Sequence, residues 1–371
     1  MCIRDRMEGL EKIMEDTNGE IARIITKAEA KRLLHDGNGT VIGVEYEKGG
    51  ALHQEYGPVV IATGGFGADY KPDSLLKKYR PDLQALPTTN GDHCTGDGIK
   101  MAMAVGADTI DMTSVQVHPT GLVNPSEPDS KVKFLAAEAL RGVGGILLDA
   151  DGNRFADELG RRDYVSGEMN KNKAPFRLIL NGKASKEIEW HCKHYVGRGI
   201  MKRHNSGADV AKEMGISPQK LADTFAKYNE CARTKKCPFG KKFFTNAPFE
   251  MNDFFHSAIV CTVVHYTMGG LAINNESQVV SEAGIPVPGL YAAGEVAGGI
   301  HGRNRLGGNS LLDCVVFGRV AGDTACRHLL SSAIKALRTG GTARVGGGET
   351  ALNRVAHLNA HRGPAPAARL A

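Results

Sequence analysis

The sequence lacks the features that mark disulfide-rich, zinc-binding and membrane-spanning proteins. Its 371 residues include one tryptophan, and its eight cysteines are scattered without a C-x-x-C pair. We therefore predict neither a disulfide framework nor a metal site, but free thiols in a reducing compartment. No stretch approaches the roughly 18 consecutive apolar residues of a membrane helix, since the longest candidates, such as 257–264, are strand-sized. With 42% hydrophobic and 23% charged residues, the composition is that of a globular protein without membrane insertion.

The body of the chain also has no net charge. Residues 331–371 carry six Lys or Arg and one Glu, which accounts for the whole formal charge of +5. A neutral body has no basic field to attract phosphates, so nucleic acid is not an expected partner. This Gly-, Ala-, Pro- and Arg-rich segment has weak periodicity, and we predict a disordered or non-native tail.

The N-terminal part is predicted to form a short helix, short strands and a hairpin. We set residues 1–6 (MCIRDR) aside as artefactual or non-native, because they lack the apolar core of a secretory signal. Helical spacing predicts a helix over 7–17, and IARIIT at 21–26 predicts a strand. A turn at 36–39 lies between two strand-like segments, which indicates a hairpin. The apolar run 59–62 is typical of a strand buried on both faces, with a ligand beyond its carboxyl end.

A dinucleotide-binding domain should open with a strand, a G-x-G-x-x-G loop and a helix. No such unit precedes residue 21. The one similar segment, 142–145, is followed by the strand-like ILLDADG, so we interpret it as a turn. The sequence therefore predicts the later part of a nucleotide-binding domain without its first βαβ unit.

Three segments imitate binding sites. Residues 190–194 (WHCKH) contain metal-ligand types, but no partner pair is evident. Residues 149–153 imitate a calcium loop, but Arg154 stands where that loop needs glycine, so we predict a hairpin turn. The basic run 235–242 (KKCPFGKK) is predicted to be a solvated loop.

Four ordered motifs carry a resemblance to a known family. They are VHPT at 117–120, AEALRG at 137–142 with RFADELGRRD at 154–163, HYTMGG at 265–270, and YAAGEVAGGIHGRNRLGGNSLLDCVVFG at 291–318. Together they resemble the flavoproteins of fumarate reductase and succinate dehydrogenase. The soluble yeast and kinetoplastid type of fumarate reductase is the most similar. The resemblance extends over about residues 20–330 and implies non-covalently bound FAD.

The resemblance implies which residues contact the flavin. Residues 287–294 form a short strand that ends in small side chains, where a flat ring can approach the backbone. The apolar helix that follows can stabilise negative charge at its N-terminus. The implied cofactor contacts are Ala62, Thr63, Gly64, Asp97, Glu295, Ser310 and Leu311.

The resemblance also implies a substrate and a proton donor. Arg305, His118 and His265 match the family's substrate cations, and Thr120 is a weaker candidate. An arginine fork suits a carboxylate, so these residues imply a dicarboxylate such as fumarate or succinate.

In the family, the arginine that matches Arg162 donates a proton, and the residues that match Glu138 and Arg141 resupply it. Arg303 lacks a motif match, and we interpret it as a surface charge. The alternative interpretation is that Arg162 forms an ordinary surface ion pair with Asp163.

We predict an α/β fold in which a Rossmann-like FAD-binding domain (7–111 and 266–330) contains an inserted α+β clamp domain (112–265). The clamp should hold helices near 208–214 and 218–231. The family implies a monomer. Without its phosphate-binding unit, the chain alone is expected to bind FAD weakly or to be inactive.

The activity that the resemblance implies is the reduction of fumarate to succinate, by hydride transfer from N5 of reduced FAD and protonation by arginine. The alternatives are a succinate dehydrogenase subunit, an aspartate oxidase, another enoate reductase, or a non-catalytic fragment. The sequence does not identify the electron donor, for which NADH and a reduced flavin are candidates. It leaves the compartment open among cytosol, mitochondrion and a glycosome-like organelle.

Overall fold

The computed structural model describes residues 3–338, so what we predicted for residues 1–2 and 339–371 lies outside the described residues. The chain divides into two compact units, which we treat separately. The smaller contains the chain up to Val59, residues 288–290 and the chain from Ala325; the larger contains Val60–Val287 and Tyr291–Thr324. This division differs from our domain boundaries, which remain a prediction. Within residues 3–338, every helix is too short or too polar to cross a bilayer.

The smaller unit confirms the helix and the hairpin. Helix α1 (Ile3–Asp16) begins inside the segment that we had set aside. Strands β1 (Glu29–His35), β2 (Val41–Lys48) and β3 (Ala51–Tyr56) form an antiparallel sheet in that order. The strand predicted at 21–26 is wrong. This segment is irregular, and two of its isoleucines are more than half exposed, because strand propensity alone does not make a strand without a partner.

The larger unit is built around a six-stranded sheet with the order β7-β6-β11-β9-β8, in which β10 also pairs with β11. All these pairs are antiparallel. Its longest strand, β11, contains the strand-sized apolar run 257–264. The strands are β6 (Val115–Leu122), β7 (Phe134–Leu135), β8 (Ile146–Leu148), β9 (Phe176–Leu180), β10 (Lys202–His204) and β11 (Phe255–Thr267).

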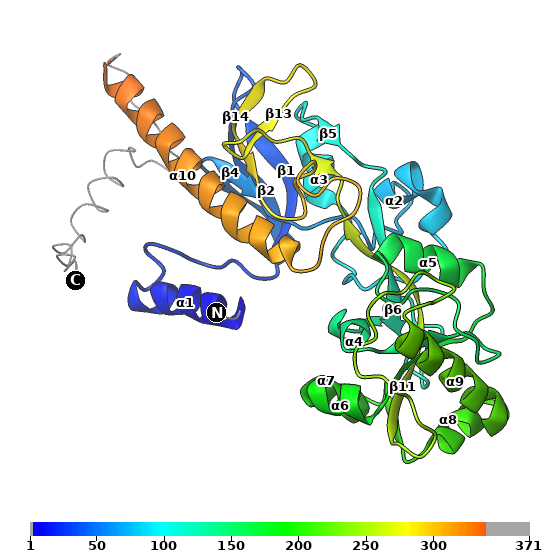
Figure 1. Ribbon diagram of the computed structural model, residues 1–371. Helices are drawn as coiled ribbons and strands as arrows, with labels where there is room; N and C mark the ends of the chain where they lie inside the picture. Colours follow the sequence, from blue (N-terminus) through cyan, green and yellow to red (C-terminus); the bar gives the residue numbers. More distant parts are fainter. Residues whose placement is uncertain (1–2, 339–371) are drawn as a thin grey trace, which may run out of the picture. The chain divides into compact units, whose positions relative to one another are not determined.

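Helices cover both faces of this sheet. In Figure 1, α6 and α7 lie on one side of β11, and α8 and α9 lie on the other. Neighbouring residues of one strand therefore belong to different buried clusters. Leu147 and Leu178 belong to one cluster, and Ile146 and Ile179 to the other, because successive side chains of a strand point to opposite faces of the sheet. The helices are α4 (Ala139–Gly142), α5 (Arg162–Asn170), α6 (Gly182–Glu187), α7 (Glu189–Gly197), α8 (Gly207–Met214) and α9 (Pro218–Thr234). The helices expected near 208–214 and 218–231 are thus present.

Short elements surround a second, three-stranded sheet with the order β13-β14-β4. Strand β4 lies at its edge within the described chain, and Val60 is 40% exposed. Our expectation of burial on both faces is therefore wrong for this strand. The remaining elements are β4 (Val59–Ile61), α2 (Leu75–Tyr79), η1 (Pro81–Leu83), α3 (Asp97–Met103), β5 (Thr109–Ile110), β12 (Gly270–Leu271), β13 (Gln278–Val280), β14 (Pro286–Ala292) and α10 (Asn309–Arg338).

Three local predictions can be compared with the structure directly. Residues 142–145 form the turn that we expected, since α4 ends at Gly142 and β8 follows. The segment around Asp151 is a hairpin turn, in which Asp149 Oδ1 accepts hydrogen bonds from the N–H groups of Asp151 and Asn153. Helix α10 continues to Arg338, so the start of the predicted tail is helical.

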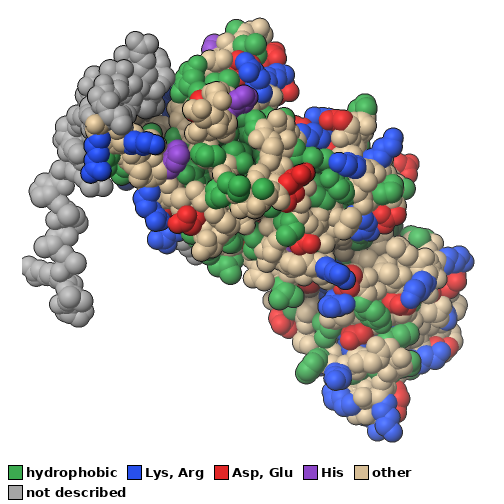
Figure 2. Space-filling view, turned by 90° about the horizontal axis from the view of Figure 1, so that it is seen from above, with side chains coloured by type: hydrophobic (Ala, Val, Ile, Leu, Met, Phe, Trp, Pro, Cys, Tyr) green, Lys and Arg blue, Asp and Glu red, His purple; other side chains and the backbone are tan. Residues whose placement is uncertain are grey.

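Figure 2 shows acidic and basic side chains interspersed over the visible face.

Candidate functional site

Two adjacent strands bring the predicted histidines together. On β6, Gln116, His118 and Thr120 are almost fully buried and alternate with their neighbours, so they share one face. On β11, the register shifts between Val264 and Tyr266, and His265 lies in this bulge. A bulge changes the direction of a side chain. The two imidazole rings end 5.2 Å apart, centroid to centroid, nearly perpendicular to one another.

His118 presents an unpartnered donor. Its Nδ1 accepts a hydrogen bond from the backbone N–H of Thr120 at 3.3 Å, and Thr120 Oγ1 lies 3.1 Å from the same nitrogen. A neutral imidazole whose Nδ1 accepts must carry its proton on Nε2. Nε2 is buried and has no protein partner in the described chain. Burial, and then the neighbouring His265 and arginines, lower the pKa of His118 well below its usual value, so the ring is neutral at physiological pH.

His265 is also neutral, but both of its nitrogens are engaged. Arg305 Nη2 lies 3.3 Å from His265 Nε2, and Thr89 Oγ1 lies 2.7 Å from Nδ1. Because a guanidinium only donates, Nε2 accepts and the proton is on Nδ1, where it is donated to Thr89. Burial and Arg305 lower the pKa of His265 to about 4.

Gln116 joins two arginines. Its Oε1 accepts from Arg162 Nη1 at 2.6 Å and from Arg305 Nη2 at 3.4 Å. Its Nε2 donates to the side chain of Asn304 and to the backbone carbonyl of Arg305. Arg305 lies over the ring of Tyr266 at 4.4 Å, and its Nε has no partner within the described residues. Burial, and then Arg162, lower the pKa of Arg305.

Arg162, Glu138 and Arg141 form a continuous chain of ion pairs. Arg162 donates from Nε and Nη2 to the two oxygens of Glu138, at 3.2 and 2.6 Å. Arg141 Nη2 donates to Glu138 Oε1 at 3.0 Å, and its Nη1 donates to the carbonyl of Glu158. The hydrogen bond from Arg162 lowers the pKa of Glu138.

The alternative interpretation, a surface ion pair between Arg162 and Asp163, is wrong. Asp163 forms its ion pair with the exposed Arg161, at 3.0 Å, and also accepts a hydrogen bond from Asn304 Nδ2. Arg162 is instead buried against Glu138 and Gln116. Arg303 is exposed, as expected for a surface charge.

The predicted flavin contacts gather at the ends of β4 and β14. The N–H of Ala293 donates to the carbonyl of Ile61, which joins the two strand ends. Gly65 follows Ala62, Thr63 and Gly64, and a Cβ there would collide with Thr267 and Glu295. Glu295 Oε1 accepts from the N–H of Thr267 at 2.9 Å. Burial raises the pKa of Glu295 to about 7.

Helices α3 and α10 border this region. A Cβ on Gly98 of α3 would collide with Thr63, so α3 packs closely on the turn after β4. Asp97, the first residue of α3, is half exposed and interacts with Thr95 and Lys71. Helix α10 starts at Asn309, one residue before Ser310, and Leu311 is 50% exposed. A Cβ on Gly294 would lie 3.1 Å from Cys314, which brings the segment after β14 close to α10.

These residues fit the ribityl and ring end of FAD. Glu295 offers a carboxyl group held by Thr267, and the absence of a side chain at Gly65 keeps the backbone open beside it. The first N–H groups of the long helix α10 offer donors for negative charge. Their contacts with the cofactor remain a prediction.

Sequence reasoning missed several residues that complete the site. Gln116 could have been found, because it lies two residues before His118 in a strand and therefore faces the same way. Thr89 and Asn304 lie in loops, and no sequence pattern indicates their partners.

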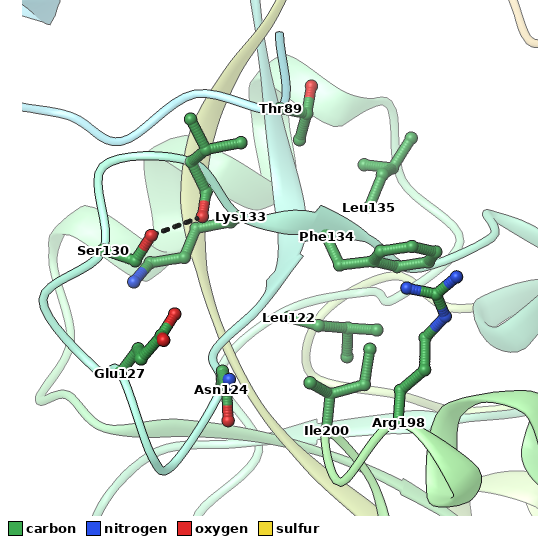
Figure 3. Close-up of a pocket in the computed structure, with 11 residues that line it drawn as sticks. Thr89, Leu122, Asn124, Glu127, Ser130, Lys133, Phe134, Leu135, Arg198 and Ile200 are labelled. Carbon is green, nitrogen blue, oxygen red and sulfur yellow. Dashed lines mark hydrogen bonds between the residues drawn. The ribbon is translucent and has the colours of Figure 1, made fainter. Parts of the chain in front are cut away.

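A pocket of about 570 Å³ extends from Thr89, the partner of His265. Figure 3 shows its apolar wall, where Leu122 and Ile200 lie near each other and Phe134 lies beside Arg198. The Arg198 guanidinium is 4.9 Å from the centre of the Phe134 ring. Thr89 is thus shared between this pocket and the histidine pair.

Comparisons with known proteins agree with this geometry. A family model described as FAD binding domain matches residues 7–311. A fumarate reductase of Schizosaccharomyces pombe is 48% identical over 316 residues, which cover 84% of this chain and 60% of that protein. Fumarate reductase 1 of Saccharomyces cerevisiae is 38% identical, with 84% and 68% covered.

Among solved structures, the open conformation of a flavocytochrome c3 fumarate reductase matches with a TM-score of 0.66 and 32% identity. This match covers 84% of this chain and 54% of that one. The chain therefore spans about half to two thirds of the length of these relatives. The sequence match, the mixed α/β fold and the residues at the ends of β4 and β14 agree. This chain belongs to the FAD-dependent flavoprotein family of fumarate reductase and succinate dehydrogenase.

Proposed function

We propose that this protein reduces fumarate to succinate with FAD as its cofactor. The observation that carries the proposal is that two buried donors, Nε2 of His118 and Nε of Arg305, have no protein partner within the described residues; the same holds for Arg141 Nε. A buried donor left unpaired costs about 1–3 kcal/mol. An anion that accepts from these donors removes that cost, and a carboxylate has the oxygens to do so.

A dicarboxylate suits the arrangement better than a monocarboxylate. His118 donates from β6, and Arg305 donates from the loop before α10. We infer that each of these donors takes one carboxylate of a four-carbon substrate. As the substrate becomes more negative during reduction, these fixed donors stabilise the charge without reorganising.

Arg162 is assigned as the proton donor to the second alkene carbon. A free guanidinium, with a pKa above about 12, is a poor acid. It serves only if its proton is replaced at once. Glu138 accepts two hydrogen bonds from Arg162 and one from Arg141, so a proton can move along this chain of groups. When bound, reduced FAD supplies the hydride.

The test is turnover of the FAD-loaded protein with a reduced viologen dye under anaerobic conditions. We expect fumarate to reoxidise the dye, with one succinate formed for every two molecules of this one-electron donor oxidised. Acrylate, which lacks the second carboxylate, should react about ten- to a hundredfold more slowly in kcat/KM, because one charge-assisted contact worth about 1.5–3 kcal/mol is lost. Absence of succinate from FAD-loaded protein, or equal rates with acrylate, would contradict the proposal.

A further inference from the structure

The basic run 235–242, which follows α9, contributes one lysine to the interior. The other three lysines of the run are exposed, but Lys241 is fully buried. Our prediction of a solvated loop is therefore wrong at this position. The ammonium of Lys241 lies 2.9 Å from Oε2 of Glu158, and neither side chain is accessible to solvent. The loop thus places a cation against a glutamate of the motif RFADELGRRD, which the proposed reduction does not yet use.

Glu158 joins a second cation to the first. Arg154 donates to it from two nitrogens, from Nε to Oε1 at 2.7 Å and from Nη2 to Oε2 at 2.8 Å. This two-point contact fixes the carboxylate in direction as well as in position. Arg154 is itself enclosed, because its guanidinium lies 4.7 Å from the centre of the Tyr228 ring and 5.4 Å from that of Phe239. We call Arg154, Glu158 and Lys241 the buried ion cluster.

Burial of such a cluster is poor evidence for a role in stability. Taking three charges out of water is costly, and apolar side chains of similar size often stabilise a protein as well or better. Charged groups provide direction instead, because each hydrogen bond fixes the atoms that it joins. The buried ion cluster is therefore expected to hold a particular piece of backbone in place.

That piece of backbone leads directly to the proposed proton donor. The carbonyl oxygens of Glu158 and Gly160 both accept from Nη1 of Arg141, at 2.6 and 3.2 Å. Helix α5 begins two residues after Gly160, at Arg162. The segment 158–162 thus carries the buried ion cluster at its first residue and the proton donor at its last, and it supplies two acceptors to Arg141.

Both arginines have to reach the same carboxylate. Glu138 accepts from Arg162 at 2.6 and 3.2 Å and from Arg141 at 3.0 Å. The two arginines lie on different helices, α5 and α4, and the segment 158–162 contains one of them and contacts the other. Proton transfer requires heavy atoms about 2.6–3.2 Å apart, and a misplacement of about 1 Å can cost about a hundredfold in rate. A shift of the segment would therefore disturb both contacts of Glu138.

We propose that Glu158, held by Arg154 and Lys241, is a positioning residue for proton delivery. Its side chain fixes the segment 158–162, and the segment in turn holds the two arginines on Glu138. This role rests on the proposed function, in which an arginine protonates the substrate. The buried ion cluster passes no proton to the substrate and acts through the residues that do.

The first test compares Glu158→Gln with the wild type in FAD-loaded protein under anaerobic conditions. Glutamine keeps the size of the side chain but loses its charge and one of the two oxygens that Arg154 contacts. We expect kcat for fumarate to fall about ten- to a hundredfold, with KM within about threefold because His118 and Arg305 are untouched. The solvent isotope effect on kcat should rise, since proton transfer becomes slow relative to other steps. Reoxidation of the reduced flavin by ferricyanide, which takes electrons and needs no proton delivery to a substrate, should be unchanged.

Glu213→Gln is the matched control. Glu213 of α8 also forms an ion pair in the larger unit, with the buried His204 at 2.9 Å. Its loss should lower the free energy of unfolding but leave kcat and the isotope effect unchanged. Equal losses of kcat in the two variants, or a slower reaction with ferricyanide in Glu158→Gln, would indicate a general loss of structure and would overturn the proposal.

A double variant covers the case in which Glu158→Gln does not fold. The buried ion cluster has two cations and one carboxylate, so its net charge of +1 becomes +2 in Glu158→Gln and returns to +1 in Glu158→Gln/Lys241→Met. Methionine retains much of the apolar stem of lysine, so we expect the double variant to fold. Its kcat should still fall, because the two-point contact with Arg154 is lost. Wild-type kcat in either folded variant overturns the proposal.

A crystal structure of the folded variant keeps this role separate from the proposed function. Arg141 and Arg162 should move away from Glu138 by about 0.5 Å or more, whatever reaction the protein performs. Contacts that remain as in the wild type overturn the positioning role, even where kcat is lower. Failure of the FAD-loaded wild type to form succinate contradicts the proposed function instead.

Discussion

At the scale of single residues, proton positions decide what the site can bind. His118 keeps its proton on Nε2, which has no partner among residues 3–338, while His265 keeps its own on Nδ1 and donates it to Thr89. A hydroxyl both donates and accepts, so Thr89 can serve either tautomer of His265. A substrate that takes Arg305 away from His265 would leave Nε2 free to become a donor.

We therefore predict that Thr89→Val lowers kcat/KM for fumarate by about tenfold, roughly the worth of one hydrogen bond. Thr89→Ser retains the hydroxyl and should restore most of the activity. Steady-state kinetics of the two variants provide the measurement. If valine and serine behave alike, the hydroxyl is not what positions His265.

Arg305 is expected to act in both binding and turnover. It contacts His265 and Gln116, and its Nε has no partner in the described part of the chain. In Arg305→Ala, KM should rise and kcat should fall, with kcat/KM reduced by roughly a hundredfold or more, since hydrogen bonds to charged groups are worth about 1.5–3 kcal/mol each. Unchanged KM and kcat would mean that the substrate binds elsewhere.

At the scale of elements, the segment after β14 is joined to the end of β11 through one carboxyl group. Glu295 accepts from the N–H and the hydroxyl of Thr267, and burial raises its pKa from 4.5 to about 7. Over this range the folded protein keeps a proton that the unfolded chain has already released. The contribution of Glu295 to the free energy of unfolding therefore falls as pH rises from about 4.5 to about 7.

Glu295→Gln removes this titration. We predict that the stability of the wild type relative to the variant decreases across that interval by at most about 3 kcal/mol. Urea unfolding of both proteins without FAD, at several pH values, measures the difference. His265 has the opposite sign, because its lowered pKa costs stability as pH falls, and it cancels in the comparison. A constant difference between the two proteins would show that Glu295 titrates normally.

At the scale of the whole molecule, sequence patterns predicted the helices and strands better than they predicted the burial and the partners of those elements. Helices α8 and α9 and the hairpin of β1 and β2 follow from local spacing. The strand expected at 21–26 failed, because its apolar residues found no partner strand in the described chain. Burial of β4 was also overestimated, since a strand's exposure depends on neighbours that are distant in sequence.

The same limit applies to the site, where the sequence predicted residues but not the contacts between them. Motif resemblance identified His118, His265, Arg305 and Arg162, and the structure brings them together around Gln116. The sequence did not reveal Gln116 as the connection. Nor did it show that Arg161, rather than Arg162, pairs with Asp163. The resemblance matched Arg162 rather than Arg161, but only the packing of α5 against β6 shows which of these two neighbouring arginines is buried.

Arg162 and Arg161 offer the most direct test of the central claim that a buried arginine delivers the proton. Arg162 is buried on Glu138 and Gln116, whereas the side chain of Arg161 is 76% exposed. The measurement is the rate of fumarate reduction by FAD-loaded protein under anaerobic conditions, with flavin absorbance as the control for bound cofactor. We predict that Arg162→Ala and Arg162→Lys lose activity by at least about a thousandfold with FAD retained, while Arg161→Ala stays within about twofold. Retention of more than about a tenth of the wild-type rate in FAD-loaded Arg162→Ala would contradict the account.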